Sequence, residues 1–114
     1  MDIDLTGKSA LVTGGGSGIG AACVRELAAC GAKVAVADLS AAAARAVADE
    51  IGGGATAITA DVSNPGDASR MVTETLDAFG SLDIAVNNAG VGMPTKASVG
   101  ATDIAEWRRV LSIN

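Results

Sequence analysis

Five glycines gather in one short segment of the chain, Gly14-Gly15-Gly16-Ser17-Gly18-Ile19-Gly20. The segment lies between an apolar run, residues 9–12, and an alanine-rich stretch with helical character. Glycine has no Cβ, so it adopts positive φ and lets backbone N–H groups approach a ligand closely. A helix that begins there offers unpaired N–H donors and the positive end of its dipole to an anion. The segment predicts a phosphate site at a strand-to-helix turn, although a glycine-rich turn without a ligand has the same composition.

A carboxylate follows this segment, because Asp38 lies eighteen residues after Gly20 and ends a second apolar run, residues 34–37. A dinucleotide-binding fold places an acidic residue at about this distance, where it accepts hydrogen bonds from ribose hydroxyls. Residues 14–22 contain no lysine and lack the Gly-Lys-Ser/Thr ending of a Walker loop, which argues against a nucleotide triphosphatase. The pattern favours a dinucleotide held by backbone groups.

The rest of the chain predicts strands and helices in alternation. Apolar runs predict strands over residues 9–12, 33–37, 55–60 and 82–86. Helical spacing predicts helices over residues 18–29, 41–51 and 65–79, and a last helix that begins near Thr102 or Asp103. Residues typical of helix ends stand at the matching positions, and these are Gly31, Ser40, Asn64, Pro65 and Gly80.

Spacing also predicts which helix faces are buried. The apolar positions of the first helix step by three or four residues, and they are Ile19, Cys23, Leu27 and Cys30. The third helix has one apolar stripe, formed by Ala68, Met71, Val72, Thr75, Leu76 and Phe79. Seven residues of helix separate the two cysteines by about 10 Å, too far for a disulfide. We therefore expect Cys23 and Cys30 to be core thiols.

Alternation of strands and helices predicts an α/β fold with a parallel sheet and right-handed crossovers. We expect a Rossmann-like doubly wound sheet with three layers, α/β/α, in a single domain portion over residues 1–114. A complete fold of this kind usually needs a longer chain. The chain also stops inside a periodic helix and leaves residues 82–86 as an apolar edge strand. We therefore expect this segment to be the N-terminal part of a longer, incompletely represented domain.

Composition excludes several classes of partner. Eight basic and thirteen acidic residues give a net charge of −5 without a basic cluster, which argues against binding to nucleic acid or to an anionic membrane. No apolar stretch reaches the roughly 18 residues of a membrane span, and the acidic start Met1-Asp2-Ile3-Asp4 differs from a targeting signal. We expect a soluble, cytoplasmic protein. The chain has no histidine, so a metal site has little support.

The last part of the chain holds two further features. We expect residues 91–101 to form a long loop beyond the carboxyl end of a strand, where open sheets bind ligands. This loop borders either a substrate site or only solvent. On the last helix, Asn114 shares one face with Trp107, Val110 and Leu111. An amide on an apolar stripe needs a partner, which is either a catalytic group or neighbouring backbone.

Several motifs together resemble the short-chain dehydrogenase/reductase family. The glycine segment with its preceding Thr13 matches the family pattern TGxxxGxG without a departure. Asp61-Val62, Asn87-Asn88-Ala89-Gly90 and Asn114 follow in the family's order and spacing. The combination is far more specific than any one motif, and it covers the whole chain.

The resemblance implies a role for each of these residues. The cofactor pyrophosphate would lie against Gly14, Gly16, Ser17, Gly18, Ile19 and Gly20. Asp38 would accept hydrogen bonds from the adenosine ribose, and Asp61 and Val62 would border the adenine. Past the fourth strand, Asn88, Ala89 and Gly90 would line the cofactor, and Asn114 would support a proton-relay water. A purely structural role remains open for each, and for Asn87 we favour it.

Charge favours NAD over NADP. The Asp38 carboxylate would repel a 2′-phosphate, and neither the glycine segment nor the two residues after Asp38 include arginine or lysine. The resemblance implies hydride transfer between NAD(H) and a carbonyl or secondary alcohol, and a homotetramer or dimer. In this family a tyrosine acts as the general acid and base, and a lysine lowers the pKa of that tyrosine. This chain has no tyrosine, so we expect the segment alone to be inactive. The alternative is a non-catalytic nucleotide-binding or regulatory module, or an inactive truncation.

Overall fold

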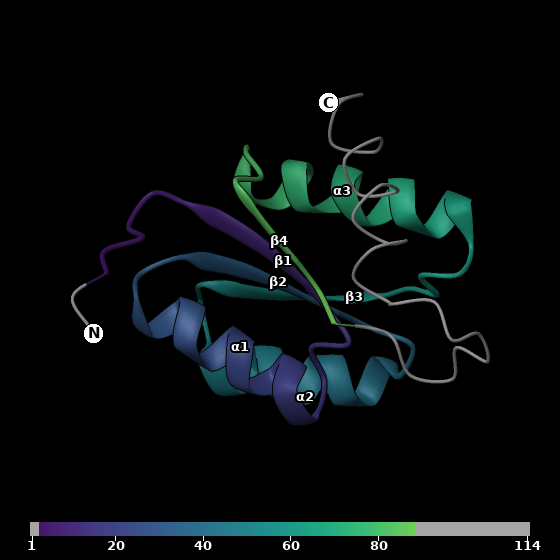
Figure 1. The fold of residues 1–114 in the computed structure, drawn as a ribbon, viewed down its shortest axis with the longest axis horizontal. Helices are drawn as coiled ribbons and strands as arrows, with labels where there is room; N and C mark the ends of the chain where they lie inside the picture. Colours follow the sequence, from purple (N-terminus) through teal and green to yellow (C-terminus); the bar gives the residue numbers. More distant parts are fainter. Residues whose placement is uncertain (1–2, 89–114) are drawn as a thin grey trace.

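The computed structural model describes residues 3–88, which form strands and helices in strict alternation (Figure 1). The strands are β1 (Ser9–Thr13), β2 (Lys33–Asp38), β3 (Ala55–Thr59) and β4 (Ile84–Asn87). The helices are α1 (Gly18–Ala29), α2 (Ala41–Ile51) and α3 (Pro65–Phe79). The last predicted helix and the loop before it lie outside the described residues.

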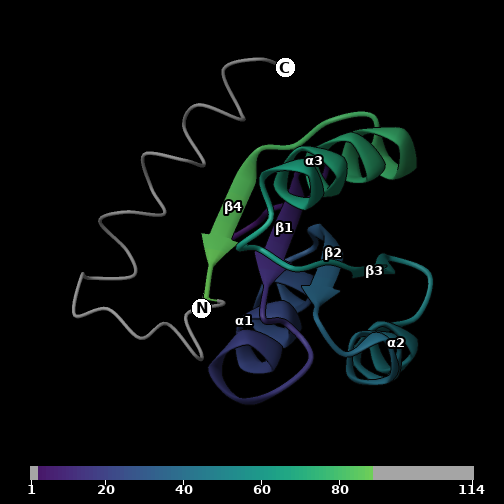
Figure 2. The same ribbon diagram turned by 90° about the vertical axis from the view of Figure 1, so that its right-hand side faces the viewer.

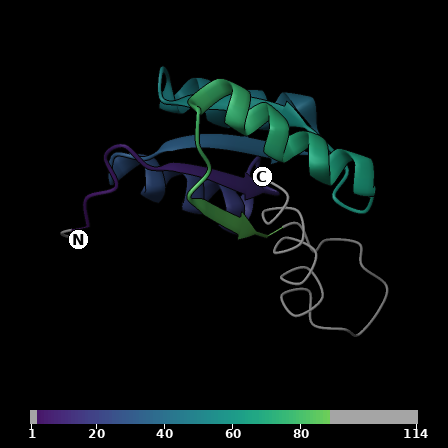
Figure 3. The ribbon, with the colours of Figure 1, turned by 90° about the horizontal axis from the view of Figure 1, so that it is seen from above.

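The described strands form one parallel sheet in the order β3-β2-β1-β4. Figure 3 shows β4 beside β1, and β1 beside β2. The chain builds outward from β1 to β3, and α3 then carries it back across the sheet to the other side of β1. The carboxyl ends of β1 and β2 therefore lie next to each other, where Thr13 pairs with Ala37.

Helices cover both faces of the sheet, with α1 and α2 on one face and α3 on the other (Figures 1 and 2). Strand residues alternate between these faces. Leu11, Ala35 and Ile58 pack with Met71 of α3. On the opposite face, the core formed with α1 and α2 contains Val12, Val24, Val34, Val36, Ala44 and Val47. The predicted three-layer, doubly wound α/β fold is confirmed for the described part of the chain.

Local capping explains the helix ends. The Ser40 hydroxyl accepts a hydrogen bond from the Ala43 N–H at the start of α2, and Asn64 caps α3 from its side-chain oxygen. Gly80 ends α3 in the left-handed conformation that glycine adopts without strain. The predicted bounds of all three helices are confirmed.

Each strand ends one residue away from its predicted end, and two predictions are wrong by more than this. The strand predicted at residue 82 begins at Ile84, because the preceding Asp83 bonds its side chain and backbone to Ser9 at the start of β1. Ile19 is 75% exposed instead of lying on the core face of α1. The buried residues of that helix are Gly20, Ala21 and Val24, since the close approach of Gly20 to the glycine loop turns a different face inward.

The two cysteines are free thiols, as their spacing predicts. Both are half-buried, so neither is a fully buried core residue. Cys23 packs at the border of the core under α1 and α2. Within residues 3–88, no helix has the length and apolar character needed to cross a membrane.

Candidate functional site

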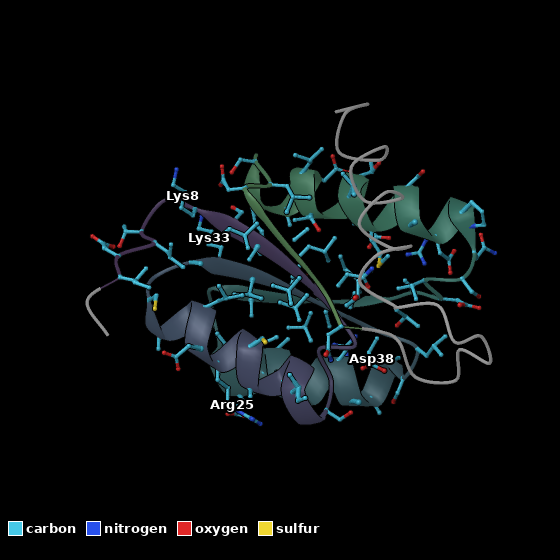
Figure 4. All side chains as sticks on the ribbon, viewed as in Figure 1. Lys8, Arg25, Lys33 and Asp38 are labelled. Atoms are coloured by element: carbon cyan, nitrogen blue, oxygen red, sulfur yellow. The ribbon has the colours of Figure 1, made fainter. Side chains whose placement is uncertain are left out.

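The predicted site residues that the structure describes lie at the carboxyl ends of the strands. The glycine loop connects β1 to α1, Asp38 ends β2, and Asn88 follows β4. Figure 4 shows Asp38 at one end of the sheet, with Lys8 and Lys33 near the other. Ligands of open α/β sheets bind at this end, where the strand order reverses. Of the predicted residues, Ala89, Gly90 and Asn114 lie outside the described part.

Positive φ angles shape the glycine loop. Gly14 has φ 63° and Gly18 has φ 57°, values that suit glycine far better than other residues. The N–H of Gly15 donates to the carbonyl of Ala37 on β2, at 3.0 Å. The N–H of Gly16 donates to Oδ2 of Asp38, also at 3.0 Å. These two donors serve the protein's own structure, so an anion would have to bind further along the loop.

The start of α1 has the donors that such an anion needs. Among the three helices of residues 3–88, only α1 has an N-cap residue, Ser17, whose side chain makes no capping hydrogen bond. The first turn of α1 also contains no acidic residue. The N–H groups of that turn have no acceptor within the helix, and Ser17, Gly18 and Ile19 are exposed. The loop therefore presents free backbone donors and a positive dipole end to solvent.

Two positions of the loop, Gly18 and Gly20, need glycine for different reasons. A Cβ built on Gly18 would meet no atom of the described chain within 4 Å, so the space beside it is open to a ligand. A Cβ on Gly20 would overlap the carbonyl oxygen of Gly14 and would lie 2.8 Å from Nδ2 of Asn88. Gly20 thus brings the helix start against the loop and the segment after β4.

Asp38 is held from two sides. Oδ2 accepts the hydrogen bond from the Gly16 N–H, and Oδ1 accepts one from the Ser40 N–H at 3.0 Å. A carboxylate has about four lone-pair positions, so both oxygens retain capacity to accept from a ligand hydroxyl. The side chain is half-buried at the end of β2. Its orientation is therefore set before any ligand arrives.

Asp61, which follows β3, supplies a second carboxylate at this end of the sheet. Oδ1 of Asp61 accepts hydrogen bonds from the N–H and the hydroxyl of Ser63, at 2.9 and 2.6 Å. These bonds lower the pKa of the Asp61 carboxyl, the hydroxyl contributing most. Val62 is half-buried and packs against the core between the sheet and α3. The pair offers a carboxylate beside an apolar surface at the same end of the sheet.

Thr13 organises the junction of β1 and β4. Its buried hydroxyl lies 3.0 Å from Oδ1 of Asn87 and accepts a hydrogen bond from the Asn88 N–H. Thr13 opens the TGxxxGxG pattern but is not among the site residues that the sequence predicts.

The described part of the site contains no basic side chain in the loop between β1 and α1 or at positions 39 and 40. In residues 3–88, no group of three or more His, Cys, Asp or Glu side chains is arranged to hold a metal ion. The arrangement can bind an anion through backbone N–H groups and hydroxyl groups through the Asp38 carboxylate.

Comparisons with known proteins agree with this geometry. A curated relative, 2,5-dichloro-2,5-cyclohexadiene-1,4-diol dehydrogenase of Sphingobium indicum, is 43% identical over 97% of the chain and 44% of that protein. The structure of a 3-ketoacyl-(acyl-carrier-protein) reductase from Brucella melitensis complexed with NADH has TM-score 0.79 and 36% identity, and the match covers 95% of this chain and 50% of that one.

A third match is a short chain dehydrogenase/reductase from Burkholderia phymatum in complex with NAD. It has TM-score 0.83 and 29% identity, covering 97% of this chain and 45% of that one. The chain thus spans less than half the length of the curated relative above. The sequence model described as short chain dehydrogenase matches residues 8–114. The chain belongs to the short-chain dehydrogenase family of oxidoreductases.

Proposed function

We propose that residues 1–114 are the NAD-binding portion of a short-chain dehydrogenase that transfers hydride between NAD(H) and a carbonyl or secondary alcohol. One observation carries this proposal. Gly16 comes directly before Ser17, the N-cap of α1 whose side chain makes no capping hydrogen bond. The Gly16 N–H also donates to the Asp38 carboxylate, so the proposed anion site and this carboxylate lie next to each other. A dinucleotide needs both an anion site and a ribose acceptor at this separation along the chain.

Each residue then has a place in the proposed complex. The pyrophosphate lies against Ser17, Gly18 and Ile19, while Gly14 and Gly20 shape the loop. Asp38 accepts hydrogen bonds from the ribose, and Asp61 and Val62 border the adenine. Asn88 lines the cofactor with two residues outside the described part, Ala89 and Gly90, and Asn114 supports proton transfer. These last assignments come from the family motifs.

We propose NAD as the preferred cofactor. The 2′-phosphate of NADP would lie near Asp38, and like charges at such a site cost several kcal/mol. Oriented by two backbone donors, the carboxylate cannot turn away from that phosphate without losing a hydrogen bond. The two solved relatives named above were crystallised with NADH and with NAD, which supports the same choice.

Bound nicotinamide supplies the hydride donor or acceptor, and the protein supplies orientation. The Sphingobium relative is named as a diol dehydrogenase, which supports a small alcohol or ketone as substrate. The chain contains no tyrosine, so the proton donor of the reaction lies outside these residues and the segment alone does not turn over. We further propose a cytoplasmic homo-oligomer, a tetramer or dimer.

The test is titration of the full-length protein with NAD and NADP by calorimetry, followed by an absorbance assay of reduced nicotinamide across alcohols and ketones. We expect tighter binding of NAD and turnover of at least one secondary alcohol. Binding of NAD without turnover of any substrate would instead indicate a non-catalytic nucleotide-binding module. Failure to bind either dinucleotide would overturn the proposed function.

A further inference from the structure

Gly16 lies where the glycine loop, Asp38 and the start of α2 meet. Its N–H donates to Oδ2 of Asp38, 22 residues later in the chain. A Cβ built on Gly16 would lie 2.7 Å from Cβ of Ala43, 2.8 Å from Oδ2 of Asp38 and 3.0 Å from the carbonyl carbon of Ala43. Real Cβ atoms essentially never approach closer than 3.0 Å, so any side chain here must displace its neighbours.

The need for glycine at this position is steric. The loop has its positive φ angles at Gly14 and Gly18, and Gly16 has none. An alanine could adopt its backbone conformation, and only the missing Cβ explains the residue. Because Gly16 has no Cβ, Oδ2 of Asp38 has room beside the Gly16 backbone. Because Ala43 belongs to helix α2 and is backed by its core residues, the flexible partner in the contact is the carboxylate.

Within residues 3–88, Asp38 has one other backbone donor, the Ser40 N–H on Oδ1. Loss of the Gly16 contact would leave the carboxylate tied at one oxygen and free to rotate about its remaining bonds. A mobile carboxylate accepts less well from two neighbouring hydroxyls, because ordering it costs conformational entropy. A mobile carboxylate can also rotate away from the 2′-phosphate of NADP, which reduces the repulsion between them.

We propose that Gly16 is a positioning residue that determines the choice between NAD and NADP by fixing the Asp38 carboxylate. This inference rests on the proposed function, and it assigns to Gly16 a role distinct from phosphate binding. The Gly16 N–H is committed to Asp38 and is not a phosphate donor. Selectivity then depends on the pair of residues, with the carboxylate supplying charge and the glycine supplying its orientation.

The test is a double-mutant cycle in the full-length protein with Gly16→Ala, Asp38→Ala and both together, using Kd for NAD and NADP from calorimetry. We expect Gly16→Ala to lower the ratio of Kd for NADP to Kd for NAD by about tenfold. In the Asp38→Ala background the same change should shift the ratio less than about twofold, because the group through which Gly16 acts is gone. Gly53→Ala is the matched control, since a Cβ there meets no described atom within 4 Å.

An unchanged ratio in a folded Gly16→Ala protein would overturn the inference, as would an equal shift in the Asp38→Ala background. Either result leaves the proposed function standing if the wild type binds NAD. If Gly16→Ala does not fold, Gly16→Ala/Ala43→Gly removes the nearest contact and keeps the one with Asp38. That pair is expected to show the lowered ratio, and a wild-type ratio in it would refute the role of Gly16.

Discussion

The side-chain hydroxyl of Thr13 accepts a hydrogen bond from the backbone N–H of Asn88, with the oxygen and nitrogen 3.0 Å apart. The two residues are 75 positions apart in the chain. Thr13 ends β1 and Asn88 follows β4, its neighbour in the sheet. One buried hydroxyl thus joins the end of β1, where the glycine loop begins, to Asn88, which we propose lines the cofactor.

We expect Thr13→Val to lower the free energy of unfolding by about 1–3 kcal/mol, because the Asn88 N–H loses its acceptor in a partly buried position. Denaturant unfolding of the full-length protein measures this change. Thr13→Ser keeps the hydroxyl and should lose less. Equal free energies of unfolding for the valine variant and the wild type would show that this hydrogen bond makes no net contribution to stability.

Gly20→Ala should destabilise the fold itself. The added Cβ would overlap the Gly14 carbonyl oxygen, and backbone cannot yield as a side-chain end does. We expect a loss of about 3 kcal/mol or more in the free energy of unfolding. Gly54→Ala, whose Cβ meets no atom of residues 3–88 within 4 Å, is the control and should stay within about 0.5 kcal/mol of wild type. A stable Gly20→Ala protein would contradict the close packing of the helix start.

Gly18→Val should remove cofactor binding from a protein that still folds. The new side chain enters open space, so its cost to stability is the strain of positive φ, while its bulk occupies the proposed phosphate site. We expect Kd for NAD to rise at least about tenfold in calorimetry. Gly80→Val imposes a similar strain, at φ 81°, at the opposite end of the sheet. Retained affinity in Gly18→Val, or an equal loss in Gly80→Val, would argue against the assignment.

Asp38→Asn separates charge from shape. The amide keeps the size of the side chain and removes the repulsion of a 2′-phosphate. We expect the ratio of Kd for NADP to Kd for NAD to fall at least about tenfold. Asp49→Asn, an exposed position late in α2, changes the net charge equally and should leave the ratio unaltered. The charge argument fails if the two variants behave alike.

Ser63→Ala should raise the pKa of Asp61 toward the ordinary aspartate value. In the wild type the Ser63 hydroxyl and N–H both favour the ionised carboxylate and lower this pKa. Their contribution to stability is present above the ordinary pKa and is lost as pH falls through the lowered value. Carbon NMR of the carboxyl group during a pH titration measures the change. Ser63→Thr keeps the hydroxyl and should retain the low pKa, and a wild-type titration of the alanine variant would refute the cause.

The helix bounds could be predicted because their signals are local. Ser40 caps α2 through a residue three positions away, and Asn64 caps α3 through residues two and three positions away. The start of β4 could not be predicted in the same way. Asp83 lies between the apolar residues Leu82 and Ile84 in sequence, but its contacts are with Ser9, 74 residues earlier.

By itself the sequence determined the alternation of strands and helices, the glycine loop and the acidic residue at the end of β2, because periodicity and capping act over a few residues. The tertiary structure alone decided which loop donors remain available and which helix face is buried. Pairing of β1 with β2 brings Gly16 to Asp38, and packing of Gly20 on Gly14 leaves Ile19 exposed. Such contacts depend on how strands and helices pack in three dimensions, and the spacing of residue types along the sequence does not specify that packing.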